Sequence, residues 1–229
     1  MAGILYGVGV GPGDPELMTL KAVRLIRENE IIALPGENPR ETTAYKIAAE
    51  AVEELEGKQL LSLFMPMTHD RTVLEESHRA AARQLENYLD QGKNVICLTL
   101  GDPTVYASFC YVQEIVKSDG YATELVSGVP SFCAAAARLN MPLALWGEPI
   151  HILPGVHCID EKIPETGTCV VMKSGSKIEQ MKEILRDCNR QVFMVENCGM
   201  PGEKIYRDWK EIPGDAGYFS ILIAKEDKR

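Results

Sequence analysis

The sequence predicts an α/β fold, with an N-terminal domain built on a mainly parallel sheet and a smaller C-terminal α/β domain. Short apolar runs alternate with segments of helical periodicity as far as Leu139, and about four to six residues connect them. This alternation is typical of a doubly wound parallel sheet. The pattern changes near Trp146–Pro149, so we expect the domains to be 1–146 and 147–229.

The first predicted elements are a strand, a glycine turn and a helix. Ile4–Val8 is a short apolar strand, and Gly9–Asp14 forms the turn that follows it. Asp14 is a good helix cap, with Pro15 at the first helical position. Apolar residues then recur with helical spacing, so we expect this helix to continue to about Asn29.

The alternation of strand and helix continues to the end of the first domain. Gly92 is placed to end a long helix, and Pro142 stops the last one. Segment 65–70 is expected to be an irregular loop. The predicted strands are Ile31–Leu34, Leu60–Phe64, Asn94–Leu100 and Thr123–Val126, and the predicted helices are Thr43–Glu54, Thr72–Gln91, Ala107–Ser118 and Phe132–Leu139.

The C-terminal domain has fewer helical segments and a hairpin-like end. No long linker separates it from the first domain, so we expect the two to pack together and share a cleft. The predicted strands are Ile150–Leu153, Thr168–Met172, Val192–Val195 and Tyr218–Ala224, with one helix at Ile178–Asp187.

The composition of the 229 residues narrows the class of protein. The formal charge is −9, from 33 acidic and 24 basic residues, and no basic run occurs, so we expect no nucleic-acid partner. No apolar run approaches the ~18 residues of a membrane span, and the N-terminus lacks the basic start of a signal peptide. The seven cysteines form no CxxC pair, which favours reduced thiols in the cytoplasm.

Three predicted strands of the first domain end in turns of small residues. The turns are Gly9–Asp14, Gly101–Pro103 and Ser127–Ser131. Because the carboxyl ends of parallel strands meet at one edge of a sheet, we expect the turns to form one floor that a ligand approaches closely. The first turn contains GxGxG but not GxGxxG, which disfavours an NAD-type dehydrogenase.

Asp102 lies in the second of these turns, where Pro103 restricts it to an extended conformation. Its carboxylate either caps the next helix, which we expect Thr104 and Val105 to begin, or faces a ligand hydroxyl or ammonium group. Ser131 presents the same two alternatives, a helix cap or a ligand contact. The sequence leaves both questions open.

Two basic side chains are further candidates for binding. Lys173 follows a strand of the C-terminal domain and is either solvated or directed at an anionic ligand. His69, in loop 65–70, is a candidate base or carboxylate partner, although a solvated loop histidine is the simpler interpretation. His151 and His157 lack metal-ligand spacing, so we expect no protein metal site.

Five motifs, taken together and in order, resemble those of the tetrapyrrole (corrin/porphyrin) methyltransferases. They run from residue 7 to residue 203 and so cover nearly the whole chain. The resemblance implies S-adenosylmethionine (S-adenosyl-L-methionine) as cofactor, an active-site cleft between two α/β domains, and a homodimer. The motifs are GVGPGDPELMTLKA, LTLGDPTVYASF, SGVPSFCAAAARL, VVMKSG and ENCGMPGE.

Within the family, the chain is most similar to enzymes that methylate carbon 20 of precorrin-2 or cobalt-precorrin-2 in cobalamin (vitamin B12) biosynthesis. This similarity lies in Phe64–Asp70, Thr99–Phe109 and Ile152–Gly155. Ser127 and Pro130 depart from the Pro-Gly-Val-Thr or Pro-Gly-Val-Ser of many members. The alternatives are the same fold acting at another corrin position or on a non-tetrapyrrole acceptor, and a noncatalytic ligand-binding module.

The resemblance also implies which residues form the site. His69 or a water molecule is the candidate acceptor for the proton that leaves the methylated carbon, and Lys173 is a further partner for substrate carboxylates. Any chelated cobalt would belong to the substrate. The implied substrate contacts are Arg40, Met67, His69, Arg71 and Tyr106. The implied cofactor contacts are Pro12, Leu100, Gly101, Asp102, Val105, Ser131, Phe132, Met172, Lys173 and Cys198.

Overall fold

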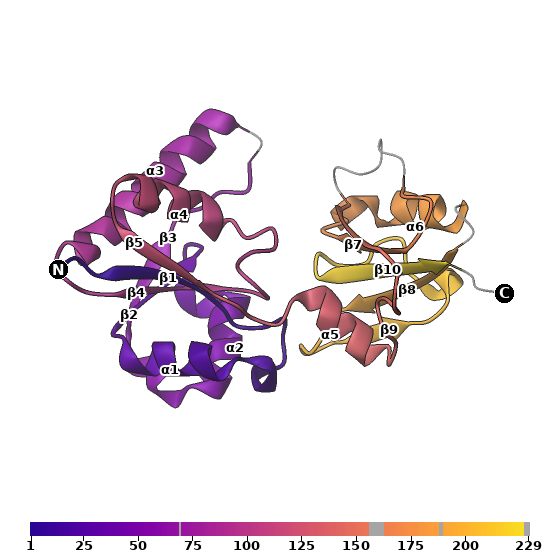
Figure 1. The fold of residues 1–229 in the computed structure, drawn as a ribbon, viewed down its shortest axis with the longest axis horizontal. Helices are drawn as coiled ribbons and strands as arrows, with labels where there is room; N and C mark the ends of the chain where they lie inside the picture. Colours follow the sequence, from indigo (N-terminus) through magenta and orange to yellow (C-terminus); the bar gives the residue numbers. More distant parts are fainter. Residues whose placement is uncertain (69, 156–162, 188–189, 227–229) are drawn as a thin grey trace. The chain divides into compact units, whose positions relative to one another are not determined.

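The computed structural model describes residues 1–68, 70–155, 163–187 and 190–226 (Figure 1). The chain divides into two compact units, Met1–Pro130 and Ser131–Arg229. The sequence predicts the division at residue 147 instead. Helix α5 (Ser131–Arg138) groups with the second unit because it contacts two strands of the second sheet.

The first unit contains a sheet of five parallel strands in the order β3-β2-β4-β1-β5. This confirms the predicted parallel sheet. Parallel strands buried on both faces are apolar throughout, which is why these runs are recognisable in the sequence. The strands are β1 (Ile4–Gly9), β2 (Ile31–Pro35), β3 (Gln59–Leu63), β4 (Val95–Thr99) and β5 (Ala122–Val126).

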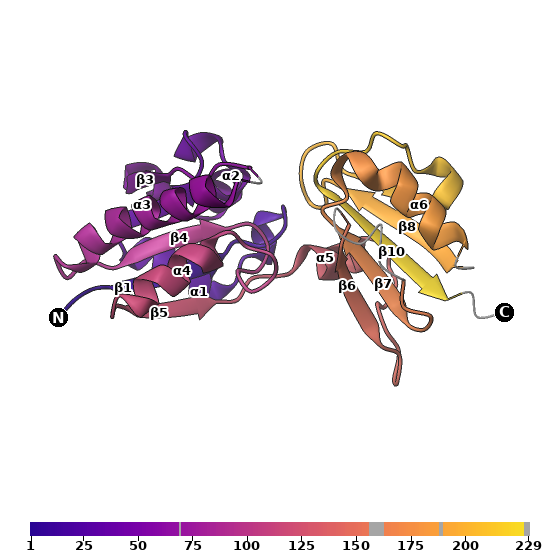
Figure 2. The ribbon, with the colours of Figure 1, turned by 90° about the horizontal axis from the view of Figure 1, so that it is seen from above.

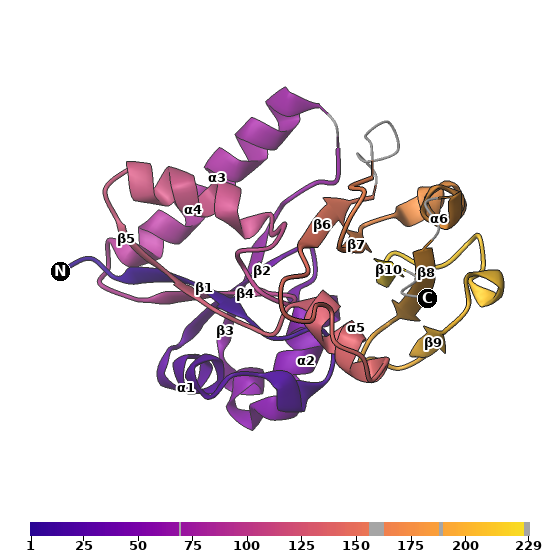
Figure 3. The same cartoon turned by 45° about the vertical axis from the view of Figure 1, so that its right-hand side comes forward.

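Helices cover both faces of this sheet (Figure 3). They are α1 (Leu20–Glu28), α2 (Thr43–Ala51), α3 (Arg71–Leu89) and α4 (Phe109–Ser118). Helices α1 and α2 pack on one face, and α3 and α4 pack on the other. Alternate strand residues serve the two faces, so Leu98 belongs to one core and its neighbour Cys97 to the other.

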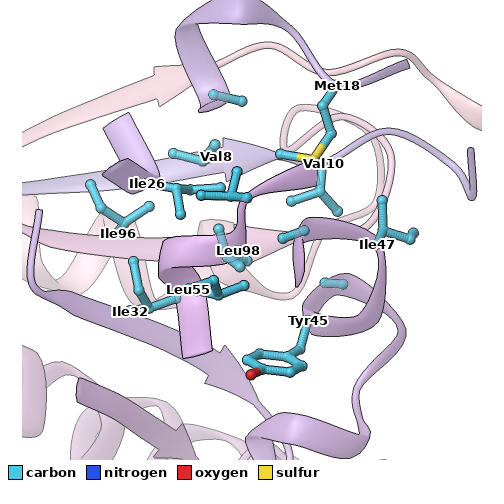
Figure 4. Packing of buried hydrophobic residues seen from close by; sticks show 14 of the residues in the cluster. Val8, Val10, Met18, Ile26, Ile32, Tyr45, Ile47, Leu55, Ile96 and Leu98 are labelled. Carbon is cyan, nitrogen blue, oxygen red and sulfur yellow. The ribbon is translucent and has the colours of Figure 1, made fainter. Parts of the chain in front are cut away.

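The core under α1 and α2 holds the strands that carry the candidate site (Figure 4). Val8, Ile32 and Leu98, from strands β1, β2 and β4, are fully buried there. Ile26 and Ile47 pack against them from the two helices. Burial of one such side chain is worth about 1.5–3 kcal/mol, so the ends of these strands have a rigid support.

The helix predicted to run from Pro15 to about Asn29 is two separate segments. A 3₁₀ turn, η1 (Pro15–Leu17), comes first, and α1 begins only at Leu20. Asp14 caps η1 by accepting from Glu16 N, and Thr19 caps α1 by accepting from Ala22 N. The chain therefore has two helix starts where the apolar spacing suggests one.

The prediction that Thr104 and Val105 begin a helix is wrong. Helix α4 begins at Phe109, and residues 103–108 form turns. Tyr106 lies in the left-handed region with a φ of 50°, which a right-handed helix does not include. The remaining short 3₁₀ segments are η2 (Pro39–Glu41), η3 (Glu53–Gly57), η5 (Gly175–Lys177) and η6 (Trp209–Glu211).

The second unit contains a mixed sheet in the order β6-β7-β10-β8-β9 (Figure 2). Strand β7 is parallel to β6, and β10 is antiparallel to both β7 and β8. Strands β6, β7 and β8 therefore point the same way, and their carboxyl ends share one edge. The strands are β6 (Ile150–Pro154), β7 (Thr168–Met172), β8 (Arg190–Glu196), β9 (Lys204–Tyr206) and β10 (Ser220–Glu226).

The predicted strands and the helix of this unit are confirmed, and short strand β9 is an addition. Helix α6 (Ile178–Asp187) and α5 lie on opposite sides of the sheet (Figure 1). Under α6, Val171, Met194 and Leu222 form the core with Met181. None of the helices in the described ranges is both long enough and apolar enough to cross a membrane.

Candidate functional site

The first unit has a topological switch point between β1 and β4. These strands are parallel neighbours, yet the chain leaves β1 toward α1 on one face and leaves β4 toward α4 on the other. In sheets of this kind a ligand binds outside the carboxyl ends of the strands at such a point. The loops 10–14 and 100–108 are therefore the first candidate site.

The backbones of these two loops are bonded to each other. Gly11 N donates to the Gly101 oxygen at 3.2 Å, and Gly101 N donates to the Gly11 oxygen at 2.8 Å. Both glycines are left-handed, with φ of 78° and 71°, a conformation that a side chain disfavours. These glycines therefore permit a close approach between two loops of the chain, in addition to any approach by a ligand.

The loop after β5 joins the same floor through Gly128. A Cβ atom built on Gly9 would lie 2.5 Å from the Gly101 oxygen and 2.7 Å from Gly128 N. A Cβ atom on Gly128 would overlap the same oxygen of Gly101. The three loops thus meet backbone to backbone, and side chains are excluded from the contact by space alone.

Asp102 connects the second and third loops. It is 7% exposed, and its Oδ1 accepts from Thr104 N at 2.8 Å and from Thr104 Oγ1 at 2.5 Å. Its Oδ2 accepts from Gly128 N at 3.0 Å. Both carboxylate oxygens therefore bind the chain itself. Of the two alternatives for Asp102, the structure favours a capping role, although the segment that it caps is a turn.

Four other candidate residues of the first unit line this floor with apolar atoms. Pro12 is buried, and Leu100 and Val105 are partly buried. Tyr106 is 41% exposed and lies in the loop after β4 in a left-handed conformation. Strain of this kind in a non-glycine residue concentrates at functional sites.

The candidate substrate contacts lie in the loops after β2 and β3, at the same edge. Arg40 Nη1 donates to Tyr45 Oη at 2.7 Å, and Nη2 donates to the Glu56 oxygen at 3.1 Å. Met67 is 92% exposed, and Arg71 is exposed at the start of α3. His69 lies outside the described residues. The structure thus gives Arg40 internal partners and leaves Arg71 directed to solvent.

In the second unit, the candidate residues gather at one edge of the sheet. Met172 ends β7, Lys173 follows it, and Cys198 follows β8, whose carboxyl end lies at the same edge. Lys173 is half-buried, and this burial lowers the pKa of its ammonium group below the ordinary 10.5. Its φ is 56°. Cys198 is buried, at 4% exposure.

The remaining two candidates begin α5. Ser131 is half-buried and Phe132 is 9% exposed, so neither side chain projects fully into solvent. Helix α5 packs on β8 and β10 of its own unit. These residues therefore belong to the second unit, together with Met172, Lys173 and Cys198.

Two residues that the sequence analysis missed complete these loops. Thr104 supplies two of the three donors to Asp102, and Asn197 holds a φ of 51° directly after β8. The signals were present in the sequence, since Asp followed two residues later by Thr favours a local turn. Asn is also the non-glycine residue that best tolerates the left-handed region.

The described part of the chain shows neither disulfides nor a grouped metal site. Its cysteines are free, namely Cys97, Cys110, Cys133, Cys169 and Cys198. Burial raises the pKa of the Cys97 thiol to about 12, so this thiol is an inert core side chain. Among the described residues, no three His, Cys, Asp or Glu side chains gather as ligands for a metal ion.

Sequence comparison connects the chain to proteins of known class. A family model described as tetrapyrrole (corrin/porphyrin) methylases matches residues 4–211. A probable cobalt-precorrin-2 C(20)-methyltransferase of Methanocaldococcus jannaschii is 33% identical, over 98% of this chain and 97% of that protein. The cobalt-precorrin-2 C(20)-methyltransferase of Salmonella typhimurium is 26% identical, over 99% of this chain and 98% of that protein.

Structural comparison supports the fold. The uroporphyrin-III C-methyltransferase of Thermus thermophilus, in complex with S-adenosylhomocysteine, matches with a TM-score of 0.72 at 22% identity, covering 98% of each chain. A putative cobalamin-synthesis-related protein from Corynebacterium diphtheriae matches with a TM-score of 0.78 at 17% identity, covering 99% of each. These likenesses, at 17% and 22% identity, show the fold.

Proposed function

The chain belongs to the tetrapyrrole (corrin/porphyrin) methylase family, and we propose that it transfers a methyl group from S-adenosylmethionine to carbon 20 of cobalt-precorrin-2 or precorrin-2. This reaction belongs to cobalamin biosynthesis. The observation that carries the proposal is the match over almost the full length of both chains to a probable cobalt-precorrin-2 C(20)-methyltransferase. Precorrin-2 C(20)-methyltransferase of a Sinorhizobium species is 25% identical over 96% of this chain, in agreement.

The alternatives within the fold have weaker support. The uroporphyrinogen-III C-methyltransferase of Pseudomonas aeruginosa also matches 96% of this chain, but at 25% identity, below the 33% of the carbon-20 relative. A noncatalytic binding module would not need the complete set of strand-end loops that this chain retains. We therefore place the acceptor at carbon 20.

The loops fit the cofactor. Gly9, Gly101 and Gly128 have no side chains, so the floor where the three loops meet is made of backbone. When bound, S-adenosylmethionine supplies an electrophilic methyl group on a sulfonium. We assign its binding to Pro12, Leu100, Gly101, Asp102, Val105, Ser131, Phe132, Met172, Lys173 and Cys198. Among these, Asp102 acts through the loops that it holds, because its oxygens already accept from the chain.

The chain's own contribution to the chemistry is alignment. Carbon 20 of the substrate is already nucleophilic, since the pyrrole nitrogens feed electrons into it, so no protein nucleophile is needed. Fixing two reacting groups in line is worth ~7–11 kcal/mol of the barrier. A rigid floor of backbone, supported by the core of the first unit, is suited to that task. His69 or a water molecule then accepts the proton that leaves carbon 20.

The acetate and propionate groups of the substrate require cationic partners. Arg71 and Lys173 are our first choices, together with His69. The Arg71 guanidinium has no hydrogen-bond or ion-pair partner among the described residues, whereas the Arg40 guanidinium already donates to Tyr45 and Glu56. A guanidinium binds a carboxylate through two parallel hydrogen bonds, so Arg71 offers strong and directional recognition. Met67 and Tyr106 provide apolar contact for the macrocycle.

We further propose that the protein works as a homodimer in the cytoplasm. The free cysteines support a reducing compartment. Leu145 is 59% exposed and Trp146 is fully exposed, and a second copy would cover such apolar side chains. Light scattering after size-exclusion chromatography tests the dimer directly, since a monomer of 25.3 kDa and its dimer differ twofold in mass.

An anaerobic assay tests the function. Purified protein receives S-adenosylmethionine with either cobalt-precorrin-2 or metal-free precorrin-2, and the products are identified by mass and NMR. We expect one added methyl group at carbon 20, with the faster substrate identifying the natural one. Methylation at another carbon would contradict the assigned position, and the absence of any cofactor binding would contradict the methyltransferase itself.

A further inference from the structure

The loop after β8 is held in an unusual conformation. Three of its residues are left-handed, namely Asn197, Gly199 and Gly202, with φ of 51°, 71° and 81°. Within the loop, Met200 N donates to the Asn197 oxygen at 2.9 Å, and Glu203 N donates to the Met200 oxygen at 3.1 Å. Such a backbone is strained at Asn197 and needs external contacts to persist.

Glu203 provides the main external contact. Its Oε2 accepts from Gly199 N at 2.7 Å, inside the loop. Its carboxylate also accepts from Arg138 of α5, with Nε at 2.9 and 3.0 Å from the two oxygens and Nη2 at 2.5 Å from Oε1. The Glu203 side chain is 15% exposed. Arg138 and the Gly199 N–H group lower the pKa of the Glu203 carboxyl below the ordinary 4.5.

This single carboxylate therefore joins two elements that the proposed function uses. Helix α5 begins with Ser131 and Phe132, and the loop after β8 contains Cys198, all three of which are proposed cofactor contacts. A second bond supports the C-terminal end of the helix, where Arg138 lies, since Arg207 Nη1 donates to the Leu139 oxygen at 2.9 Å. Oε2 of this carboxylate accepts from Gly199 of the loop, and both of its oxygens accept from Arg138 of the helix.

We propose that Glu203 is a positioning residue for cofactor binding, acting through the Cys198–Gly199 turn and through Arg138. This inference rests on the proposed function. Glu203 does not need to touch the cofactor, because its ion pair and its bond to Gly199 set the distance between the two contacting elements. Charge-assisted hydrogen bonds of this kind are about twice as strong as neutral ones and are directional, which suits them to such a role.

Calorimetry with S-adenosylhomocysteine as the probe tests this inference on three variants of the full chain. In Glu203→Gln, the amide NH₂ group faces either Arg138 or Gly199 N, which are both donors, so one charge-assisted hydrogen bond is lost. We expect about tenfold weaker binding, the size of that loss. Arg138→Gln keeps the Gly199 bond, so we expect a smaller loss. Glu179→Gln is the matched control, because it removes the ion pair with Lys182 elsewhere in the same unit and is expected to bind as the wild type does.

Kinetics separates positioning from general destabilisation. We expect Glu203→Gln to raise KM for S-adenosylmethionine while kcat at saturation stays close to that of the wild type. Unchanged affinity in both Glu203→Gln and Arg138→Gln would overturn the inference, whatever happens to their melting temperatures. If Glu203→Gln does not fold, Arg138→Gln decides alone. Failure of the wild type to bind the probe would overturn the proposed function, and this inference with it.

Discussion

The strand-end loops of the two units are built on opposite principles. In the first unit, the close contacts are made by glycines, and Gly11 and Gly101 take up the left-handed conformations. In the second unit, the residues that directly follow β7 and β8 are Lys173 and Asn197, which are left-handed although they carry side chains. Where its loops contact one another, the first arrangement avoids strain, although Tyr106 in the loop after β4 is left-handed, and the second has strained residues directly after its strands.

This difference indicates what each set of loops contributes. A glycine is required where a Cβ atom would overlap another backbone, so the first unit supplies shape. A strained non-glycine residue persists only where its side chain has a use that offsets about 1–3 kcal/mol. On the proposed function, the second unit supplies side-chain chemistry, and we expect Lys173 to be its cation. In each unit a carboxylate accepts a backbone N–H group of a neighbouring loop residue, Asp102 from Gly128 and Glu203 from Gly199.

The largest expected effect comes from breaking the glycine contact. Gly128→Ala places a Cβ atom on the Gly101 oxygen, which is backbone and cannot turn away. We expect a loss of about 3 kcal/mol or more in the free energy of unfolding, together with loss of S-adenosylhomocysteine binding. Urea denaturation and calorimetry measure the two. Gly57→Ala is the control, since no atom lies within 4 Å of the added Cβ, and wild-type stability in Gly128→Ala would refute the packed floor.

A smaller effect is expected from Asp102→Asn. The amide can accept from Thr104 but then turns its donor toward Gly128 N, leaving one partly buried N–H group unpaired. We expect about 1–3 kcal/mol of lost stability and a change in cofactor affinity of less than about tenfold. Thermal denaturation and calorimetry check this. Full stability combined with a much larger loss of affinity would mean that the carboxylate faces the cofactor directly.

Lys173→Gly tests the left-handed residue that follows β7 in the second unit. Glycine relieves the left-handed strain but adds entropy to the unfolded chain, so we expect a net gain in stability of about 0.5–1 kcal/mol. In the methylation assay, we expect KM for the tetrapyrrole to rise because a cation is lost. Asn197→Gly is the control, with a smaller gain, since Asn tolerates this conformation. Loss of stability in Lys173→Gly would show that the lysine is there for the fold.

The smallest expected effect is a pH dependence that belongs to Glu203. Its pKa is lower in the folded chain than the ordinary 4.5, so the unfolded chain binds more protons in the window between the two values. The stability that this carboxylate contributes is complete above pH 4.5 and is lost as the pH falls through the lowered pKa. Denaturation midpoints of wild type and Glu203→Gln should therefore converge on acidification. A constant difference down to the lowest accessible pH would contradict this assignment.

The sequence predicts the strands of both sheets because each is an apolar run between turn residues. It does not predict the role of Asp102, which depends on a distant group, or the residue at which α4 begins. Gly128 N, which binds Asp102, is 26 residues away along the chain, and no local pattern encodes that bond. Tyr106 is left-handed, so α4 begins only at Phe109, and no glycine at position 106 indicates this in the sequence.

The assignment of α5 to a domain also depends on distant contacts that local sequence does not show. Its apolar spacing after β5 is that of a crossover helix, so the sequence assigns it to the first domain. Among the residues that the structure describes, no sixth strand returns to the first sheet, whose strands are β1 to β5, and α5 packs on β8 and β10 instead. Short strand β9 was missed because the three residues Lys204–Tyr206 are too few to show a period.

The most direct measurement is an NMR titration of the ¹⁵N-labelled protein with S-adenosylhomocysteine. If the carboxyl edge of the first sheet is the cofactor floor, the largest amide shifts will occur at Gly11, Gly101 and Val105, with a second group at Lys173 and Cys198. Shifts confined to other regions, such as the hollow of about 680 Å³ that Met141, Leu145 and Phe193 help to line in the second unit, would contradict this assignment.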